Sequence, residues 1–202
     1  MIFYKPPGDG TQIRNIDMTF EKTSIEGLIV ITPDVFSDER GYFFESYNFK
    51  KYSAGGFENS FVQDNISKSK KGTVRGLHYQ IGEFVQGKLC SVITGSVLDI
   101  AVDIRFGSPT FGKYLSIELN DVDKKQFWIP PGFAHGFSVL SDEAIFSYKC
   151  TSVYSKEHER SIRFNDPDLN IDWGITDPIV SAKDLKAERF SNISKDFIYS
   201  IG

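Results

Sequence analysis

The sequence lacks the features that mark several common classes of protein. It has only two cysteines and three histidines, and no stretch approaches the roughly 20 apolar residues that a membrane helix requires. The N-terminal stretch MIFYKPPGDGTQIRN contains no apolar run like that of a secretory signal peptide. A formal net charge of −4 provides no basic face for nucleic acid. These absences predict a cytoplasmic protein with reduced thiols that binds neither nucleic acid nor membranes.

Groups of metal-binding residues are missing as well. His78, His135 and His158 stand far apart, and neither Cys90 nor Cys150 belongs to a CxxC pair. Because a tight metal site draws on several such ligands at suitable spacing, the sequence predicts no bound metal. It also contains no GxSxG sequence typical of serine hydrolases and no dinucleotide-binding fingerprint. We therefore expect that the protein needs no cofactor.

Strand patterns, by contrast, are plentiful. In LDIAVDIR, residues 98–105, apolar side chains alternate with Asp99, Ala101, Asp103 and Arg105, which is the period of a β-strand. We interpret the charges of this strand as structural groups that pair with neighbouring strands. Further short strands are predicted at residues 60–69, 88–95, 113–120, 125–130 and 145–154.

Many short strands separated by glycine- and proline-containing turns predict an all-β sandwich or barrel, with a jelly roll as the leading candidate. We expect a few short peripheral helices, at residues 48–56 and 181–190. No repeat, linker or break in composition divides the chain. The sequence therefore predicts one jelly-roll domain over residues 24–202, including a C-terminal tail, preceded by an N-terminal arm of residues 1–23.

A candidate acid–base pair comes from two of the strand-like runs. His78, in GTVRGLHYQ, is of the residue type that most often accepts a proton near neutral pH, and Tyr148, in IFSYKC, is a weak acid. Lys88 and Arg75 offer cations for an enolate or for phosphates. The alternative is a hydrogen-bonded core histidine and a half-buried aromatic. Arg75 and His78, three residues apart, share a face only if Gly76 bends or bulges the strand.

Longer blocks of the sequence carry a more specific signal. In order, they are DERGYFFES, FVQDNISKSKKGTVRGLHYQ, QGKL, VDIRFGSPTFGK, WIPPGFAHGFSVLSDEA, YKCTSVYSKEHERSIRFNDPDLNIDW and SAKD. Together they resemble the dTDP-4-dehydrorhamnose 3,5-epimerase family, over a match from about Ile25 to Asp184. The resemblance implies a cupin-like jelly-roll homodimer without metal or cofactor, which acts on a dTDP-4-keto-6-deoxy sugar and inverts its C3 and C5.

The resemblance also implies roles for individual residues. It makes His78 the base, pairs it with Asp184 of the SAKD block, makes Tyr148 the proton donor, and places Lys88 near the C4 oxygen of the sugar. Residues that hold the substrate would be Arg40, Glu45, Gln63, Asp64, Asn65, Arg75, His135, Tyr154, Glu159 and Lys183, with Tyr154 stacked on the thymine.

Several alternatives fit the same residues. An epimerase that acts at C3 only or at C5 only, in another deoxysugar pathway, would keep the same histidine, tyrosine and lysine. A barrel that binds sugar nucleotides without catalysis is a second alternative, and a metal-dependent cupin is a third. Glu45, Asp64 and Glu159 could each be solvated surface carboxylates, and His135 could cap the turn that precedes its strand.

Overall fold

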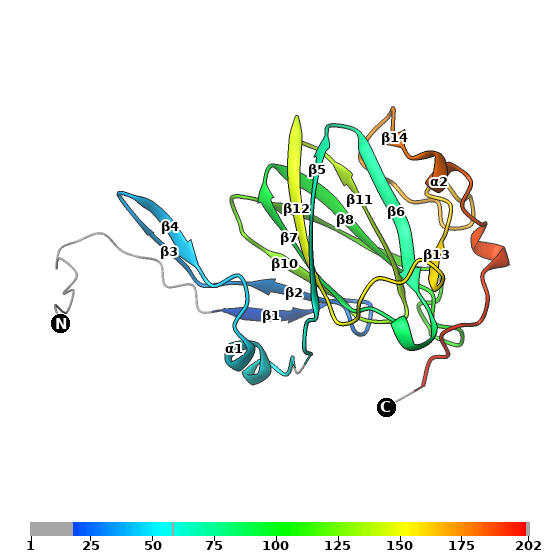
Figure 1. The fold of residues 1–202 in the computed structure, drawn as a ribbon, viewed down its shortest axis with the longest axis horizontal. Coiled ribbons are helices and arrows are strands. Elements are labelled where there is room, and N and C mark those ends of the chain that lie inside the picture. Colours follow the sequence, from blue (N-terminus) through cyan, green and yellow to red (C-terminus); the bar gives the residue numbers. More distant parts are fainter. Residues whose placement is uncertain (1–17, 58, 201–202) are drawn as a thin grey trace.

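The computed structural model describes residues 18–57 and 59–200, and its secondary structure is mostly β. Two six-stranded sheets face one another, and a separate two-stranded hairpin extends from one end (Figure 1). The first sheet has the order β1 (Thr19–Lys22), β2 (Ile29–Thr32), β10 (Gln126–Ile129), β7 (Lys88–Thr94), β12 (Glu143–Cys150) and β5 (Gln63–Lys70). The predicted all-β class is confirmed.

The second sheet has the order β13 (Glu159–Ser161), β6 (Thr73–Gln80), β11 (Phe133–Val139), β8 (Ser96–Asp103) and β9 (Tyr114–Asn120), with β14 (Ile179–Val180) paired to β6. The hairpin consists of β3 (Val35–Asp38) and β4 (Gly41–Phe44). Short helices are α1 (Phe49–Ala54) and α2 (Ala182–Leu185), with 3-10 turns at Gly82–Phe84 and Phe190–Asn192. Both predicted helices are present but shorter than expected.

The predicted N-terminal arm divides into two parts. Residues 1–17 lie outside the described residues. The following strand β1 pairs antiparallel with β2 at the edge of the first sheet. This end of the arm is therefore part of the β-structure.

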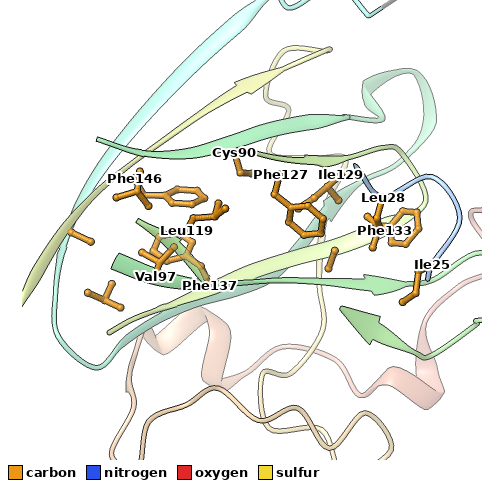
Figure 2. Close-up of a cluster of buried hydrophobic side chains, with 14 residues drawn as sticks. Ile25, Leu28, Cys90, Val97, Leu119, Phe127, Ile129, Phe133, Phe137 and Phe146 are labelled. Carbon is orange, nitrogen blue, oxygen red and sulfur yellow. The ribbon is translucent and has the colours of Figure 1, made fainter. Parts of the chain in front are cut away.

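The interior between the sheets is filled with aromatic and aliphatic side chains (Figure 2). Phe137 of β11 and Phe146 of β12 stack with ring centroids 4.2 Å apart, so they join the two sheets. Other members of this buried cluster are Ile25, Leu28, Cys90, Val92, Val97, Ala101, Leu119, Phe127, Ile129, Phe133, Val139 and Ala144. This hydrophobic core holds the two sheets together.

Strand β8 turns a charged side chain towards the interior between the sheets. Its face with Ile100 and Val102 packs against Phe164 and Trp173 of the C-terminal segment, outside the space between the sheets. The opposite face, which carries Asp99, therefore turns inward with Ala101. The predicted alternation is present, but both faces are buried, because the C-terminal segment covers the second sheet.

A bulge in β6 brings Arg75 and His78 to the same side. His78 pairs with His135 of β11, whereas Arg75 pairs with Phe137. The two β6 residues are three positions apart and their partners only two, so β6 has one extra residue here. Gly76 lies within the bulge at φ +127°, and a Cβ there would lie 2.5 Å from the Cα of Gly136. Only glycine fits this close approach. The bend that the sequence required at Gly76 is confirmed.

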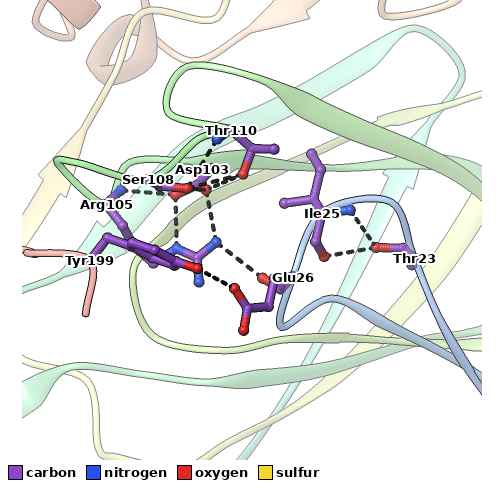
Figure 3. Close-up of polar contacts among 8 residues, drawn as sticks. All are labelled: Thr23, Ile25, Glu26, Asp103, Arg105, Ser108, Thr110 and Tyr199. Atoms are coloured by element: carbon purple, nitrogen blue, oxygen red, sulfur yellow. Dashed lines mark hydrogen bonds and ion pairs between the residues drawn. The ribbon is translucent and has the colours of Figure 1, made fainter. Parts of the chain in front are cut away.

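Asp103 anchors the end of β8 (Figure 3). Its carboxylate accepts hydrogen bonds from Arg105 Nε at 2.9 Å, Ser108 Oγ at 2.6 Å and Thr110 Oγ1 at 2.7 Å. Arg105 also donates to the backbone oxygen of Glu26. The pair is therefore structural, as expected, but it forms within one loop rather than across neighbouring strands. Burial alone would raise the pKa of Asp103, but these hydrogen bonds lower it below the ordinary value.

We expect Asp103→Asn to lower the free energy of unfolding by about 2–4 kcal/mol at neutral pH, because it leaves a partly buried guanidinium without its charge partner. A folded-state pKa below the unfolded value gives stability above the unfolded pKa that is lost as pH falls through the folded pKa. The difference between the proteins should therefore shrink in acid. Urea unfolding of both proteins at several pH values measures it. The exposed Asp142→Asn is the control, and an equal loss at every pH would contradict the prediction.

Candidate active site

A cavity of about 520 Å³ lies between the two sheets, beside the apolar core. Nine of the fourteen predicted site residues line it: Arg75, His78, Lys88, His135, Tyr148, Tyr154, Glu159, Lys183 and Asp184. They come from β6, β7, β11, β12, β13 and α2, and from the loop after β12. The fold thus gathers residues that are as much as 109 positions apart (75 to 184) around one space.

His78 and Asp184 form a hydrogen-bonded pair in this cavity. Nε2 of His78 lies 2.7 Å from Oδ1 of Asp184, whose side chain is almost fully buried. Asp184 belongs to α2, and its backbone N–H donates to the Ser181 cap. Burial alone would raise the pKa of Asp184, but the hydrogen bond and charge of His78 outweigh it and lower the pKa. An ionised Asp184 fixes the proton on Nε2 and leaves the other ring nitrogen as a base.

Tyr148 lines the cavity from the other sheet. It lies on β12, whereas His78 lies on β6, so the two side chains enter the cavity from opposing sheets. Burial raises the pKa of Tyr148 to about 12, and nearby Cys150 contributes to the rise. The phenol therefore keeps its proton at neutral pH, which is the state that a proton donor needs.

Lys88 lies at the start of β7 and is buried at the wall of the cavity. Burial lowers the pKa of its ammonium group, and the neighbouring Cys150 and Cys90 partly oppose this shift. A cation in such a site acts more strongly on a developing negative charge than it would in water.

His135 forms a second histidine–carboxylate pair that the sequence did not reveal. Its Nε2 lies 2.6 Å from Oδ1 of Asp99, which is completely buried on β8. Asp99 was interpreted as a structural charge of a strand face. Its strand register places it opposite Phe137, two residues from His135. Nothing in the sequence alone identifies the neighbouring strand, so no local signal could have joined these two residues.

A polar group at the mouth of the cavity consists of Tyr154, Glu159 and Lys183. The hydroxyl of Tyr154 donates to Glu159 at 2.9 Å, and Lys183 forms an ion pair with Glu159 at 2.5 Å. The backbone N–H of Tyr154 donates to Oε1 of Gln63 on β5, whose Nε2 donates to Asn65. Gln63 and Asn65 therefore adjoin the cavity through Tyr154, although they do not line it.

Three predicted site residues lie elsewhere. Asp64 points to the outer face of β5 and pairs with Lys149 at 2.9 Å. Glu45 follows the β3–β4 hairpin and pairs with Lys51 at 2.6 Å. Arg40 lies at the turn of the hairpin, where it contacts Asp38. None of the three lines the cavity of its own chain.

Residues outside the predicted set also line the cavity. Ser67 of β5 has a buried hydroxyl that has no hydrogen-bond partner among the described residues. Gln80 accepts a hydrogen bond from the backbone N–H of Ser155 and donates to the backbone oxygens of Phe84 and Val153, so it holds the loop that carries Tyr154. A serine on a strand gives no sequence signal, because the same residue is common on any solvated strand face.

Two opposed sheets around a cavity lined by a histidine–aspartate pair, a tyrosine and a buried lysine form a site of the kind that suits a jelly-roll isomerase working by proton transfer. No helix among the described residues has the length and apolar character to cross a membrane. The family model for dTDP-4-dehydrorhamnose 3,5-epimerase matches residues 22–192. The chain belongs to the dTDP-4-dehydrorhamnose 3,5-epimerase family, and it has the cupin fold of that family.

Known relatives agree with this assignment. A dTDP-4-dehydrorhamnose 3,5-epimerase from Shigella flexneri is 51% identical over 86% of this chain and 96% of the relative. The crystal structure of a 3,5-epimerase from Legionella pneumophila in complex with dTDP-4-keto-L-rhamnose is 48% identical, with a TM-score of 0.87 over 92% of this chain and 100% of that chain. A 3'-monoepimerase from Streptomyces bikiniensis is 31% identical, with a TM-score of 0.79 over 84% and 86% of the two chains. The chain is thus an epimerase of dTDP-rhamnose biosynthesis.

Proposed function

We propose that this chain converts dTDP-4-dehydro-6-deoxy-D-glucose to dTDP-4-dehydro-L-rhamnose through the residues of the cavity between the sheets. The observation that carries this proposal is the position of His78 and Tyr148 on opposing sheets around one cavity. A single acid–base group returns a proton mostly to the face from which it came. Two groups on two sides can remove a proton from one face and supply one to the other, which inverts the carbon.

The ketone at C4 makes the protons on C3 and C5 acidic. His78 removes one of these protons, and the bonding electrons move into the ring to form an enolate with its charge on the C4 oxygen. Tyr148 then donates its phenolic proton to the opposite face of the carbon. His78 then releases its proton to solvent and solvent reprotonates the tyrosine, and the same sequence at the second carbon completes the double inversion. No electrons are gained or lost overall, so no redox cofactor is required.

Lys88 stabilises the enolate. Its ammonium group lies in the wall of the same cavity as His78 and Tyr148. A preorganised cation of this kind contributes most when charge develops in the transition state, because it needs no solvent reorganisation. Burial removes water from the ammonium group, which disfavours its charged form. The negative C4 oxygen offsets this penalty when the enolate forms.

The nucleotide part of the substrate would occupy the mouth of the cavity. Tyr154, about half exposed, offers an aromatic face for the thymine. Arg75 donates from Nε to Ser69 at 3.1 Å, which fixes the guanidinium at the cavity wall as a partner for the diphosphate. Lys183 adds a second cation beside the base.

The chain is proposed to act as a homodimer, which would give Arg40 a role. The β3–β4 hairpin extends away from the body of the molecule and exposes Phe36, Tyr42 and Phe43 by 45%, 57% and 66% (Figure 1). An isolated two-stranded hairpin is marginally stable in water, and exposed aromatics of this size favour a protein partner. A second copy of the chain would cover these rings and receive Arg40 at its own cavity.

We expect Arg40→Ala and His78→Asn, each nearly inactive alone, to restore activity when mixed after unfolding and refolding together. In a symmetric dimer that uses Arg40 across the interface, half of the dimers are mixed and one of their two sites is intact, so about a quarter of the sites should work. Specific activity of the mixture measures this recovery. Arg40→Ala mixed with itself is the control. No recovery, with dimers present by light scattering, would assign Arg40 to its own chain.

Incubation with dTDP-4-dehydro-6-deoxy-D-glucose in deuterated water tests the function. We expect deuterium at both C3 and C5, and a dTDP-L-rhamnose product after coupled reduction. The reason is that 3,5-epimerases are about half identical to this chain and the monoepimerase is less similar. NMR of the product resolves each carbon. Deuterium at one carbon only would identify a C3 or C5 epimerase, and tight substrate binding without any exchange would identify a binding protein.

A further inference from the structure

A buried cluster of three potential metal ligands includes His135. Cys90 on β7, Asp99 on β8 and His135 on β11 each offer one ligand atom, and these atoms lie within 4.8 Å of one another. All three residues are buried, and they come from both sheets. Sγ of Cys90 lies 3.7 Å from Nε2 of His135, which in turn lies 2.6 Å from Oδ1 of Asp99. The proposed epimerase mechanism does not use Cys90.

The carboxylate of Asp99 is incompletely satisfied. Its Oδ2 is buried and has no hydrogen-bond partner among the described residues, and Oδ1 is the atom that contacts His135. A buried carboxylate oxygen without a partner is costly, because water no longer solvates it. A cation at this position would satisfy the second oxygen.

We propose that Cys90, Asp99 and His135 form a binding site for a thiophilic divalent cation such as Zn²⁺ or Cd²⁺, and that an ion bound there inhibits the enzyme. A tetrahedral zinc ion bound at ~2.3 Å to sulfur and ~2.0 Å to nitrogen holds these two atoms about 3.5 Å apart. The 3.7 Å between Sγ of Cys90 and Nε2 of His135 is close to this separation. The third ligand is the unsatisfied Oδ2 of Asp99.

Binding requires two proton movements. The thiol of Cys90 loses its proton to solvent as the metal–sulfur bond forms, and the imidazole of His135 carries its remaining proton on Nδ1 while Nε2 binds the ion. The hydrogen bond between His135 and Asp99 is broken and replaced by two metal–ligand bonds. A thiolate and a carboxylate together balance the charge of a divalent ion, so the occupied site is neutral.

The cluster has an entry path, and a neighbouring charge limits its affinity for a cation. His135 lines the cavity, so an ion can reach it from solvent, and a water molecule in the cavity can complete the tetrahedron. The charge of Lys88, which acts on Cys90, opposes the ion. We therefore expect a site that fills when metal is added rather than one that the protein needs to fold. An ion on His135 blocks the substrate, which on the proposed function contacts this residue.

Titration of the full chain with Cd²⁺ in the absence of substrate tests the site. We expect the ultraviolet charge-transfer absorption of a cadmium thiolate to appear and to saturate at one ion per chain. Cys90→Val, which replaces the thiol by an apolar side chain, should lack this absorption, and Asp99→Asn should bind at least tenfold more weakly. Cys150→Val, which removes the other thiol of the chain, is the matched control and should keep the absorption. Absence of the absorption in the wild type, or its persistence in Cys90→Val, would overturn the proposal.

A parallel assay measures inhibition. We expect Zn²⁺ to inhibit the wild type reversibly, with activity restored by a chelator, and to leave Cys90→Val active at the same concentration. Equal inhibition of both proteins would overturn the inhibitory role. Because the cadmium absorption is recorded without substrate, its failure is distinct from a failure of the proposed epimerisation. The circular dichroism of each variant shows whether the fold is kept.

Discussion

His78→Asn is expected to lower kcat by at least about 10³-fold, because removal of a general base costs factors of 10²–10⁴. The expectation rests on the 2.7 Å contact with the ionised Asp184, which leaves one ring nitrogen free to accept a proton. Asparagine keeps a polar side chain of similar reach but cannot take up a proton near neutral pH. Deuterium exchange from solvent at C3 and C5 measures proton removal directly, without a coupling enzyme.

The third histidine of the chain provides the control. His158 contacts the hydroxyl of Ser155 through Nδ1 at 2.9 Å and does not line the cavity. His158→Asn should therefore exchange at close to the wild-type rate. Exchange at both carbons in His78→Asn at the wild-type rate would remove His78 from the role of base. Loss of substrate binding in that variant, measured by calorimetry, would instead assign His78 to positioning.

Tyr148→Phe is expected to separate proton removal from proton return. The ring and its packing beside Phe146 are kept, and only the acidic hydroxyl is lost. His78 can still form the enolate, but the phenolic proton that is donated to its opposite face is missing. We expect inversion to fall by about 10²–10³-fold while exchange falls much less. The measured quantity is the ratio of exchange to inversion at each carbon, from NMR of the substrate and product pools.

Tyr114→Phe is the matched control, since its hydroxyl accepts a hydrogen bond from the backbone of Asp172, away from the cavity. This variant should keep the wild-type ratio of exchange to inversion. A Tyr148→Phe protein in which both rates fall together would show that the tyrosine takes part before the enolate forms. Unchanged inversion would assign the donor to water or to another residue.

Local sequence determined the secondary structure and the chemical inventory of this protein. Period-two alternation located the strands, because side chains of a strand point alternately to its two faces. Arg75 and His78 could share a face only if the strand bent at Gly76, and a bulge is present there because only glycine tolerates the approach of Gly136. The blocks that resemble the epimerase family named nine of the residues that line the cavity, because the chemistry of the family's reaction restricts which residue types can stand at those positions.

Tertiary structure decided which face of each strand points inward and which distant residues meet. The sequence pattern indicated that Asp99 was a structural charge on one face of its strand. The C-terminal segment covers the apolar face of β8, so the face with Asp99 points towards His135. Strand periodicity is symmetric between the two faces, so it cannot predict which one a later segment will cover. Asp64 faces outward for the related reason that neighbours on a strand point to opposite sides. Only the packing of the two sheets, through contacts between residues far apart in the chain, makes the cavity that His78 and Tyr148 line from opposing sheets.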